Sequence, residues 1–523
     1  MAQHQTIPVI DLFAGPGGLG EGFSSLGGIE PGTRRLQLRV SIEKDPIAHC
    51  TLSLRALFRA FPKDRVPDAY YRYVRGEMSR EDLFKDPSVP PEAVAASSEA
   101  KNAELGKTPH EEIDDWIGEA LDGTDEWVLI GGPPCQAYSL AGRSRRTKES
   151  QEEFESDEKH FLYKEYLRII QVFQPTVFVM ENVKGILSST HGGSGIFERI
   201  LADISNPGGK HSYRLRSFVV PGDAKDLDPH DFVIESERFG IPQARHRVIL
   251  FGVREDVAAA TPLLDEHPER LLLTPCQKEF TVEQALSGLP AVRSRLSKEP
   301  DSREAWLSAL AEAADALSPE YREKQSALVE TMRAAAKRGE RLEGNGGAFI
   351  PWSGPDQLPP KVREWYLDRR LGGVLQHESR SHMRSDLHRY LFASSFARQY
   401  RCSPKIQNFP PEFLPAHGNV SSESIPFADR FKVQMGGHPS TTVVAHIAKD
   451  GHYYIHHDPS QCRSLTVREA ARLQTFPDNY FFEGNRTQQY TQIGNAVPPL
   501  LARKIAVLVS DLIAAYRRVK SPR

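Results

Sequence analysis

A cysteine that directly follows a short apolar stretch is the residue in this sequence best suited to covalent chemistry. Trp127 to Ile130 are apolar and predict a buried strand. Gly131-Gly132-Pro133-Pro134 end that strand abruptly. Cys135 therefore follows the carboxyl end of a strand, where open α/β sheets bind their ligands. Because a thiolate is a strong nucleophile, Cys135 is a candidate for covalent catalysis. A buried structural cysteine is the alternative interpretation.

A carboxylate and two arginines stand where they could assist such a nucleophile. Thr176 to Met180 predict a second apolar strand, and Glu181 ends it. If the two strands are parallel neighbours, Glu181 lies beside Cys135. A buried, unpaired carboxylate is costly, so Glu181 needs a function or a partner. Arg245 and Arg247 enter a further predicted strand two positions apart and are expected to point the same way. One could reach the site and the other could pair with a carboxylate.

A glycine-rich turn near the start of the chain predicts a cofactor site. Ile7 to Phe13 predict a strand, which runs through Gly15 and Gly17 into a helical stretch from Glu21 to Leu26. Glycines allow the backbone to approach a ligand closely, and this order of elements is typical of nucleotide cofactors. The turn lacks Gly-Lys-Ser/Thr, so it is not a phosphate-binding P-loop.

Two acids are predicted to line the same edge of the sheet. Leu38 to Ile42 predict a second strand, which ends in Glu43. A carboxylate there can accept hydrogen bonds from ribose hydroxyls. Arg75 to Met78 are expected to end a third strand and to bring Glu77 to the same edge, and residues 79–126 are expected to form helices and loops.

Composition favours an intracellular protein of at least two domains. The chain has 523 residues, of which 39% are hydrophobic and 26% charged, as in globular proteins. Its net charge of −3 gives no overall positive field for nucleic acid. Five scattered cysteines without a Cys-x-x-Cys pair argue against disulfides or a zinc site. The first ten residues do not resemble a signal peptide, and no apolar run has membrane-spanning length.

Six motifs in order resemble those of the bacterial DNA (cytosine-5) methyltransferases. The resemblance covers roughly the first half of the chain and its last 60 residues, and the motifs span Asp11–Gly18, Gly132–Gln136, Glu181–Val183, Gln243–Arg247, Arg463–Pro477 and Gln492–Pro499. It implies an α/β fold: a Rossmann-like, S-adenosylmethionine-dependent domain with a mostly parallel sheet, plus a smaller irregular target-recognition domain. It also implies transfer of a methyl group to C5 of cytosine within a short duplex DNA sequence.

The resemblance assigns a role to each candidate residue. Cys135 would add to C6 of a flipped-out cytosine, and Glu181 would bind N3 and the exocyclic amine. Arg245 would donate to O2, and Arg247 would help to position Glu181 or the loop. Residues 136–159 would form the loop that closes on the flipped base. The S-adenosylmethionine site would comprise Phe13, Gly15, Gly17, Glu43, Glu77, Pro134 and Asn495.

The remaining expectations concern domains and partners. The catalytic domain is expected to span 1–254 and 461–523, and the recognition domain 255–460, with a solvated helical insertion near 297–342. Between Lys361 and Arg401, nine Lys or Arg face four Asp or Glu with interleaved aromatics, which favours DNA contact. We expect a cytoplasmic, nucleoid-associated monomer that needs no metal and contacts no membrane. A cognate restriction endonuclease would act on the same site without a stable complex.

Two other functions are compatible with part of this pattern. A tRNA cytosine-5 methyltransferase shares Pro-Pro-Cys-Gln, although that branch resembles a minimal catalytic domain without the large middle region. A catalytically silent DNA-binding relative would keep the fold, but Cys135, Glu181 and Arg245 are all present. A nicotinamide dehydrogenase would explain only the glycine turn. Methyl-transfer assays with tRNA and with duplex DNA distinguish these hypotheses.

Overall fold

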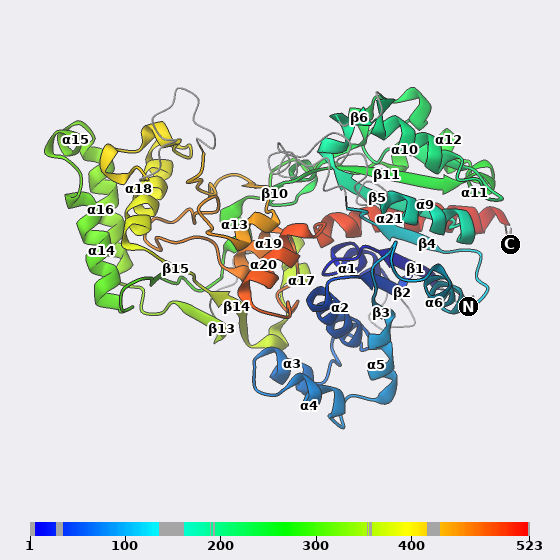
Figure 1. The fold of residues 1–523 in the computed structure, drawn as a ribbon, viewed down its shortest axis with the longest axis horizontal. Helices are drawn as coiled ribbons and strands as arrows, with labels where there is room; N and C mark the ends of the chain where they lie inside the picture. Colours follow the sequence, from blue (N-terminus) through cyan, green and yellow to red (C-terminus); the bar gives the residue numbers. More distant parts are fainter. Residues whose placement is uncertain are drawn as a thin grey trace.

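The computed structural model divides into an α/β part and an elongated remainder that extends away from it (Figure 1). The structure describes residues 6–27, 35–134, 162–188, 190–191, 194–352, 354, 358–415 and 429–520. Cys135 and the predicted loop 136–159 lie outside the described residues. Within those ranges, no helix combines the length and apolar character needed to cross a membrane.

A mostly parallel sheet forms the α/β part and confirms the predicted fold class. Its strands follow the order β3-β2-β1-β4-β5-β11-β8, with β9 paired to β11. The parallel strands are β1 (Ile7–Leu12), β2 (Leu36–Glu43), β3 (Ala100–Asn102), β4 (Val128–Gly131) and β5 (Val177–Val183). β11 (His246–Arg254) runs antiparallel to β5, β8 (Tyr213–Arg216) and β9 (Val233–Glu235).

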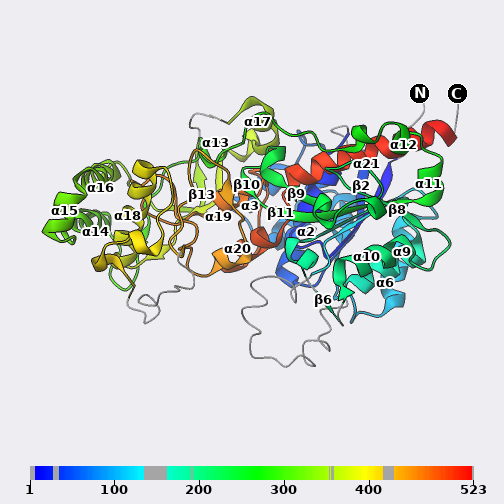
Figure 2. The ribbon, with the colours of Figure 1, turned by 90° about the horizontal axis from the view of Figure 1, so that it is seen from above.

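Helices cover both faces of this sheet, as its alternating apolar side chains require. Ile7 and Val9 of β1 pack with α1 (Gly18–Ser24) and α21 (Pro499–Lys520). Ile10 and Leu12 face the other way and share a core with α6 (His110–Leu121), α9 (Leu162–Phe173) and α10 (Ile196–Ser205). Figure 2 shows α21 above the sheet and the α6, α9 and α10 group below it. The C-terminal helix therefore packs beside the first strand.

The third strand is not where the sequence pattern placed it. Arg75 to Met78 lie in the turn between α3 (Asp68–Val74) and α4 (Arg80–Lys85). The preceding apolar residues Tyr70, Tyr71 and Val74 are buried at helical spacing rather than in strand alternation. The edge strand is instead β3, within the stretch that was expected to contain only helices and loops. Because β3 has three residues and buries only Ala100, it carries no readable pattern.

A helical bundle with its own core forms the far end of the elongated part (Figure 1). It contains α14 (Arg303–Asp315), α15 (Pro319–Lys324), α16 (Ser326–Gly339) and α18 (Arg384–Tyr400). Trp306 and Met332 are fully buried in this core together with Tyr390 of α18. The expectation of a solvated insertion at 297–342 is therefore wrong, because these helices supply half of a core that α18 completes.

Between the bundle and the sheet lies a central part that gathers segments distant in sequence. Its core joins residues of α13 (Val282–Leu286), α17 (Pro360–Tyr366), α19 (Val467–Leu473) and α20 (Arg486–Asn495). Beside it lie the hairpin of β13 (Gly346–Pro351) and β14 (Gly373–Glu378), and short strand pairs of β10 (Gln243–Ala244) with β16 (Ser440–Thr441) and β12 (Arg295–Leu296) with β15 (Ser381–His382). α19 begins with a reciprocal cap, since the Thr466 and Glu469 side chains each accept a hydrogen bond from the other's backbone amide.

The residues that follow β11 still pack against the sheet. α11 (Glu255–Ala259) and α12 (Leu263–Glu266) follow it, and Val257, Leu264 and Leu273 are buried in the same core as α21. We therefore propose that the catalytic domain extends to about residue 273, beyond the expected boundary at 254.

Several basic and aromatic side chains between residues 361 and 401 are buried or bonded to other parts of the protein. Tyr366 and Tyr390 are fully buried. Arg380 donates to backbone carbonyls of residues 447–449, and Arg384 pairs with Glu299 and Glu312. The expectation that this stretch offers an interleaved basic and aromatic DNA surface is therefore wrong for these residues, whereas Arg369, Arg398, Tyr400 and Arg401 are exposed.

Candidate active site

The carboxylate predicted to assist Cys135 lies against the segment that leads to it. β4 and β5 are parallel neighbours, with Gly131 opposite Met180. A Cβ atom on Gly132 would lie 3.0 Å from Oε2 of Glu181. The absence of a side chain at Gly132 thus allows the carboxylate to contact the chain three residues before the nucleophile candidate. Pro134, the last residue described before Cys135, lies on the same segment.

Asn182 ties the same segment to β5 from the other side. Its Nδ2 donates to the carbonyl oxygen of Pro133 at 3.4 Å, and its Oδ1 accepts from the backbone amide of Val183 at 2.8 Å. Glu181 and Asn182 therefore contact consecutive residues of the strand-end turn, which fixes the turn relative to the carboxylate.

Arg247 pairs with Glu181, as the sequence predicted for one of the two arginines. Its Nε lies 2.8 Å from Oε1 of Glu181, and both side chains are largely buried. The pairing follows from the sheet, because β11 runs antiparallel to β5 with Arg247 opposite Val183. Burial lowers the pKa of Arg247 and the Glu181 carboxylate opposes this shift, so the charges stabilise each other away from water.

Arg245 points elsewhere, and the expectation that both arginines point the same way is wrong. It lies between β10 and β11, where its backbone amide bonds the carbonyl of Gln243 at 3.0 Å and breaks the strand alternation. Its Nη1 donates to the carbonyls of Val443 at 2.9 Å and Gly494 at 3.3 Å. Burial, followed by the nearby charge of Arg247, lowers the pKa of Arg245 well below its usual value. Arg245 thus connects the start of β11 to the segments that contain Val443 and Gly494.

Three of the predicted cofactor residues meet at the carboxyl ends of β1 and β2. Gly15 has a φ of +56° and open space where a Cβ would lie, and its amide donates to Oε2 of Glu43 at 2.8 Å. The other Glu43 oxygen accepts from the amide of Asp45 at 2.8 Å. Burial raises the pKa of Glu43, and these amide bonds oppose the shift. Phe13 also has positive φ, at +56°, and directs the chain into the turn. The open space and the acid fit a nucleotide ligand.

Gly17 lies in the glycine turn, whereas Asn495 is the last residue of α20. A Cβ on Gly17 would meet Leu52 at 2.8 Å and the Tyr480 hydroxyl at 3.0 Å, so this glycine permits packing within the protein. Asn495 is exposed at the end of α20. Two residues later, the carbonyl of Val497 contacts the place where a Gly18 side chain would lie. The last motif therefore closes directly on the glycine turn.

Glu77 does not join this group. It is exposed in the turn between α3 and α4, and its nearest charged partner is Arg75, at 4.0 Å. The residue that stands beside Glu43 is Asn102, which sequence reasoning missed. Asn102 pairs with Glu43 in the β2–β3 register, and its Nδ2 donates to the carbonyls of Glu43 at 2.9 Å and Lys44 at 3.1 Å. No signal marked Asn102, because its strand is too short.

A buried acid lies beneath the glycine turn. Asp11 of β1 is fully buried, and neither carboxyl oxygen has a hydrogen-bond partner among the described residues. A Cβ on Gly20 would lie 3.1 Å from its Oδ2. Burial, reinforced by the charge of Glu99, raises the pKa of Asp11 well above its usual value, against the opposing charge of Arg59. The site therefore rests on an acid whose neutral form is favoured.

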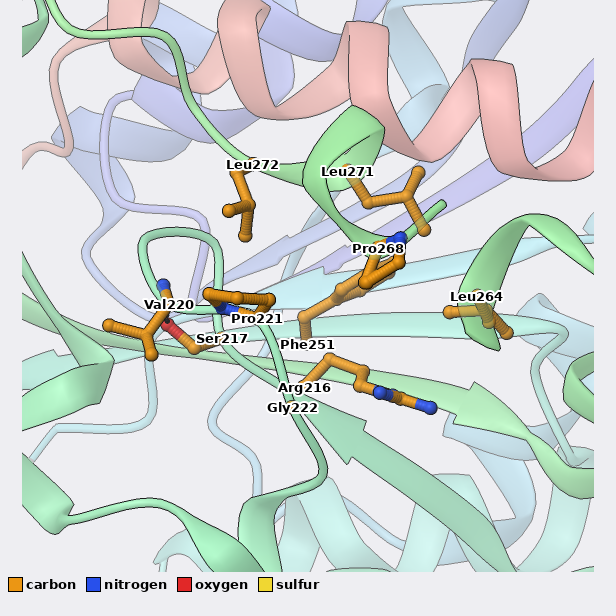
Figure 3. Close-up of a pocket in the computed structure, with 10 residues that line it drawn as sticks. All are labelled: Arg216, Ser217, Val220, Pro221, Gly222, Phe251, Leu264, Pro268, Leu271 and Leu272. Atoms are coloured by element: carbon orange, nitrogen blue, oxygen red, sulfur yellow. Dashed lines mark hydrogen bonds between the residues drawn. The ribbon is translucent and has the colours of Figure 1, made fainter. Parts of the chain in front are cut away.

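A cavity at the distant edge of the sheet is not part of this site. It lies between β8, β11 and the segment around α12 (Figure 3), and Phe251, Leu264 and Leu271 contribute apolar walls. None of the ten residues drawn in Figure 3 belongs to the predicted site. Among the residues that the structure describes, no cluster of His, Cys, Asp or Glu is arranged to hold a metal ion.

The parallel strands and the glycine turn define a Rossmann-like α/β fold, a class that commonly binds nucleotide cofactors at the carboxyl ends of its strands. A family model described as C-5 cytosine-specific DNA methylase matches residues 95–510. The chain therefore belongs to the C-5 cytosine-specific DNA methylase family.

Relatives match almost the whole chain. The Type II methyltransferase M.Bpa9945I of Bacillus paralicheniformis is 33% identical, over 97% of this chain and 99% of the relative. The Type II methyltransferase M.AgeI of Thalassovita gelatinovora is 27% identical over the same shares. A crystal structure of a protein assigned as a DNA modification methyltransferase, encoded within a prophage (E. coli), matches with a TM-score of 0.55 and 19% identity, covering 97% of this chain and 100% of that one. That likeness concerns the fold.

Proposed function

We propose that this protein transfers a methyl group from S-adenosylmethionine to C5 of cytosine within a specific short duplex DNA sequence, through covalent addition of Cys135 to C6. The observation that carries the proposal is the position of the Glu181 carboxylate: its Oε2 lies 3.0 Å from the place that a Cβ would take on Gly132, three residues before Cys135. It brings an acid, and the arginine paired with it, to the chain segment that presents the thiol.

The chemistry explains why these residue types are needed together. C5 of cytosine is a poor nucleophile, and addition of the Cys135 thiolate to C6 gives the ring enamine character at C5. Negative charge develops on the ring during addition, and the Glu181 carboxyl group, in its protonated form, relieves it by donating a hydrogen bond to N3. Bound S-adenosylmethionine would supply an electrophilic methyl group. After transfer a base, for which ordered water is a candidate, takes the C5 proton; the electron pair of the C5–H bond re-forms the C5–C6 double bond and expels Cys135 as its thiolate.

The two arginines take different parts in this proposal. Arg247 orients the Glu181 carboxylate through their ion pair. The resemblance assigns Arg245 to O2 of the base, but its Nη1 is engaged with the Val443 and Gly494 carbonyls. We therefore infer that Arg245 mainly holds the central part against the strand that carries Arg247.

The cofactor proposal rests on the open edge at β1 and β2. Glu43 offers carboxylate oxygens for ribose hydroxyls, and Gly15 leaves room for close approach of a ligand. Phe13, Pro134 and Asn495 are proposed to complete the site, with Asn102 holding the backbone of Glu43 and Gly17 permitting the turn to pack. Glu77 is excluded by its exposed position on another turn.

Duplex DNA is the proposed substrate, and the target base must leave the stack to be reached. The relatives that cover nearly the whole chain are named Type II methyltransferases, which favours DNA over tRNA and is compatible with a cognate restriction endonuclease.

Expression in a host without cytosine methylation is the test of this function. Methylation-sensitive sequencing of the host DNA is expected to reveal modified cytosines confined to one short motif. Absence of modification from cells that contain the folded protein, together with methylation of tRNA by the purified protein, would replace DNA by RNA as the substrate.

Replacement of Glu43 by glutamine is expected to raise the dissociation constant of S-adenosylhomocysteine by about 10- to 100-fold. The physical reason is the loss of charge-assisted hydrogen bonds, each worth about 1.5–3 kcal/mol. Isothermal titration calorimetry measures the constant directly. Glu77→Gln is the matched control and is expected to bind like the wild type. Equal losses in both variants would contradict the assignment of Glu43.

A further inference from the structure

One carboxylate of the central part is shared between two regions of the molecule. Oδ2 of Asp368 accepts from the hydroxyl of Tyr71 at 2.7 Å and from Nδ2 of Asn479 at 2.8 Å. Its other oxygen accepts from the backbone amide of Arg370 at 3.0 Å, at the entry to β14. Asp368 therefore fixes the base of the β13–β14 hairpin to α3 and to the segment that follows α19.

The hairpin and α3 also share an apolar contact. Leu371 and Leu375 are buried in one cluster with Tyr70 and Val74 of α3. Arg75, at the end of α3, donates to the carbonyls of Leu371 at 3.0 Å and Arg370 at 2.7 Å. The hairpin and α3 thus pack as one unit, and their apolar and hydrogen-bonded contacts hold the Asp368 backbone in place.

Asn479 continues the connection toward the cofactor turn. It is 3% exposed, and its Oδ1 accepts from Nη1 of Arg55 at 3.1 Å. Arg55, on α2 (Pro46–Arg59), donates from Nε to Glu21 at 2.9 Å and from Nη2 to the other Glu21 oxygen. Glu21 lies in α1, directly after the glycine turn. Tyr480, which follows Asn479 in the chain, donates a hydrogen bond from its hydroxyl to the carbonyl of Pro16 within that turn.

The chemical type of Asn479 suits this place between opposite charges. Its amide offers an N–H to the Asp368 carboxylate and an oxygen to the Arg55 guanidinium, so both charged groups keep a partner. A side chain that satisfied only one of them would leave the other short of a hydrogen bond in a buried setting, which is costly.

We propose that Asn479 is a positioning residue that couples the β13–β14 hairpin to the cofactor turn, through Asp368 on one side and Arg55 with Glu21 on the other. The inference rests on the proposed function, which assigns the turn to the cofactor, and on the expectation that residues 255–460, which include the hairpin, form the target-recognition domain. It goes beyond that function, because neither Asn479 nor Asp368 contacts the reacting groups. Loss of the link weakens cofactor binding and raises the KM for DNA, while the chemical step is preserved.

A reciprocal exchange of the two side chains tests the coupling. Asn479→Asp places two carboxylates together, and the dissociation constant of S-adenosylhomocysteine and the KM for DNA are each expected to rise at least about fivefold. Single-turnover transfer at saturating cofactor and DNA is expected to stay within about twofold of wild type. In the double variant Asn479→Asp with Asp368→Asn, the new acid accepts from Arg55 and from the new amide, and both constants are expected to return to within about twofold.

The outcomes separate this inference from the proposed function and from a purely structural role. If the wild type binds no S-adenosylhomocysteine, the proposed cofactor site fails and the coupling with it. If the wild type binds but Asn479→Asp lowers only the melting temperature, the residue is structural and the coupling is overturned. Failure of the double variant to recover either constant would also overturn it. Tyr71→Phe removes the neighbouring bond to the same oxygen and controls for general loosening around Asp368, so it is expected to leave cofactor affinity unchanged.

Discussion

Replacement of Cys135 by alanine is expected to lower the rate of methyl transfer by at least about a thousandfold, while binding of S-adenosylhomocysteine stays within about twofold. Loss of the nucleophile removes the covalent route altogether, and enzymes that lose their nucleophile commonly fall by several orders of magnitude. The cofactor is proposed to bind at the ends of β1 and β2, where the predicted contacts do not use the thiol. Single-turnover transfer to duplex DNA and calorimetric titration measure the two quantities.

Duplex DNA carrying 5-fluorocytosine at the target provides a second measurement of the same step. Fluorine at C5 is not lost as the proton is, so the bond between Cys135 and C6 persists after methyl transfer. Wild-type protein is expected to form a complex that survives denaturing electrophoresis, and Cys135→Ala is expected to form none. Cys276→Ala changes an exposed cysteine and is the matched control, with full activity and trapping. A stable adduct with Cys135→Ala would disprove the proposed nucleophile.

Replacement of Glu181 by glutamine is expected to slow single-turnover transfer by about 100-fold and to change DNA affinity by less than about threefold. Positioned acid groups contribute about 10²- to 10⁴-fold to rates, and glutamine cannot supply a proton to N3. The amide oxygen can still face Arg247, which limits the cost of leaving that buried guanidinium without its partner. The separation between a slow chemical step and near-normal binding is the signature of the proposed role.

Rapid-quench kinetics and fluorescence anisotropy measure these two effects for Glu181→Gln, with thermal unfolding as a check on folding. Glu237→Gln is the matched control, because Glu237 also faces a basic side chain of β11, that of His246, at 2.7 Å. His246 and Arg247 are adjacent in the strand and so lie on opposite faces of it. Equal losses in rate and DNA binding for Glu181→Gln, or a similar loss of rate in the control, would remove the proposed role.

The core of the α/β part could be predicted because its signals are local. Apolar runs of strand length ended by glycine, proline or an acid predict β1, β2, β4 and β5. Parallel pairing of β4 with β5 is the condition for placing Glu181 beside Cys135, and the structure meets that condition. Adjacent carboxyl ends then placed Glu181 beside the turn before Cys135, and the two acceptor oxygens of Glu43 lie where the strand end predicted.

Residues whose surroundings depend on distant segments could not be placed in the same way. Arg245 was expected to follow strand alternation, but its direction is set by the carbonyls of Val443 and Gly494, about 200 and 250 residues away. Glu77 was assigned to a strand, whereas tertiary packing of Tyr70 and Val74 makes the preceding stretch a helix. Asn102 gave no signal, because its strand exists only through pairing with β2.

Charge composition was a poor guide to surface for the same reason. The excess of basic residues from 361 to 401 suggested a DNA surface, yet Arg370, Arg384 and Arg389 each have a carboxylate partner. A sequence records how many charges a stretch carries, and only the fold determines which of them are already neutralised.

The position of α21 has a consequence for synthesis of the protein. β1 and α1 leave the ribosome before the later elements of this chain, but the face of the sheet on which α1 packs is also covered by Leu501, Ile505 and Val509 of α21. Nearly 500 further residues must be translated before that helix is available. Because domains usually fold as they emerge, the nascent sheet keeps an apolar face exposed for most of translation, and the glycine turn stays without the Val497 contact that closes on it. We therefore expect newly made chains to depend on chaperones, and to gain cofactor affinity only after α21 has been translated.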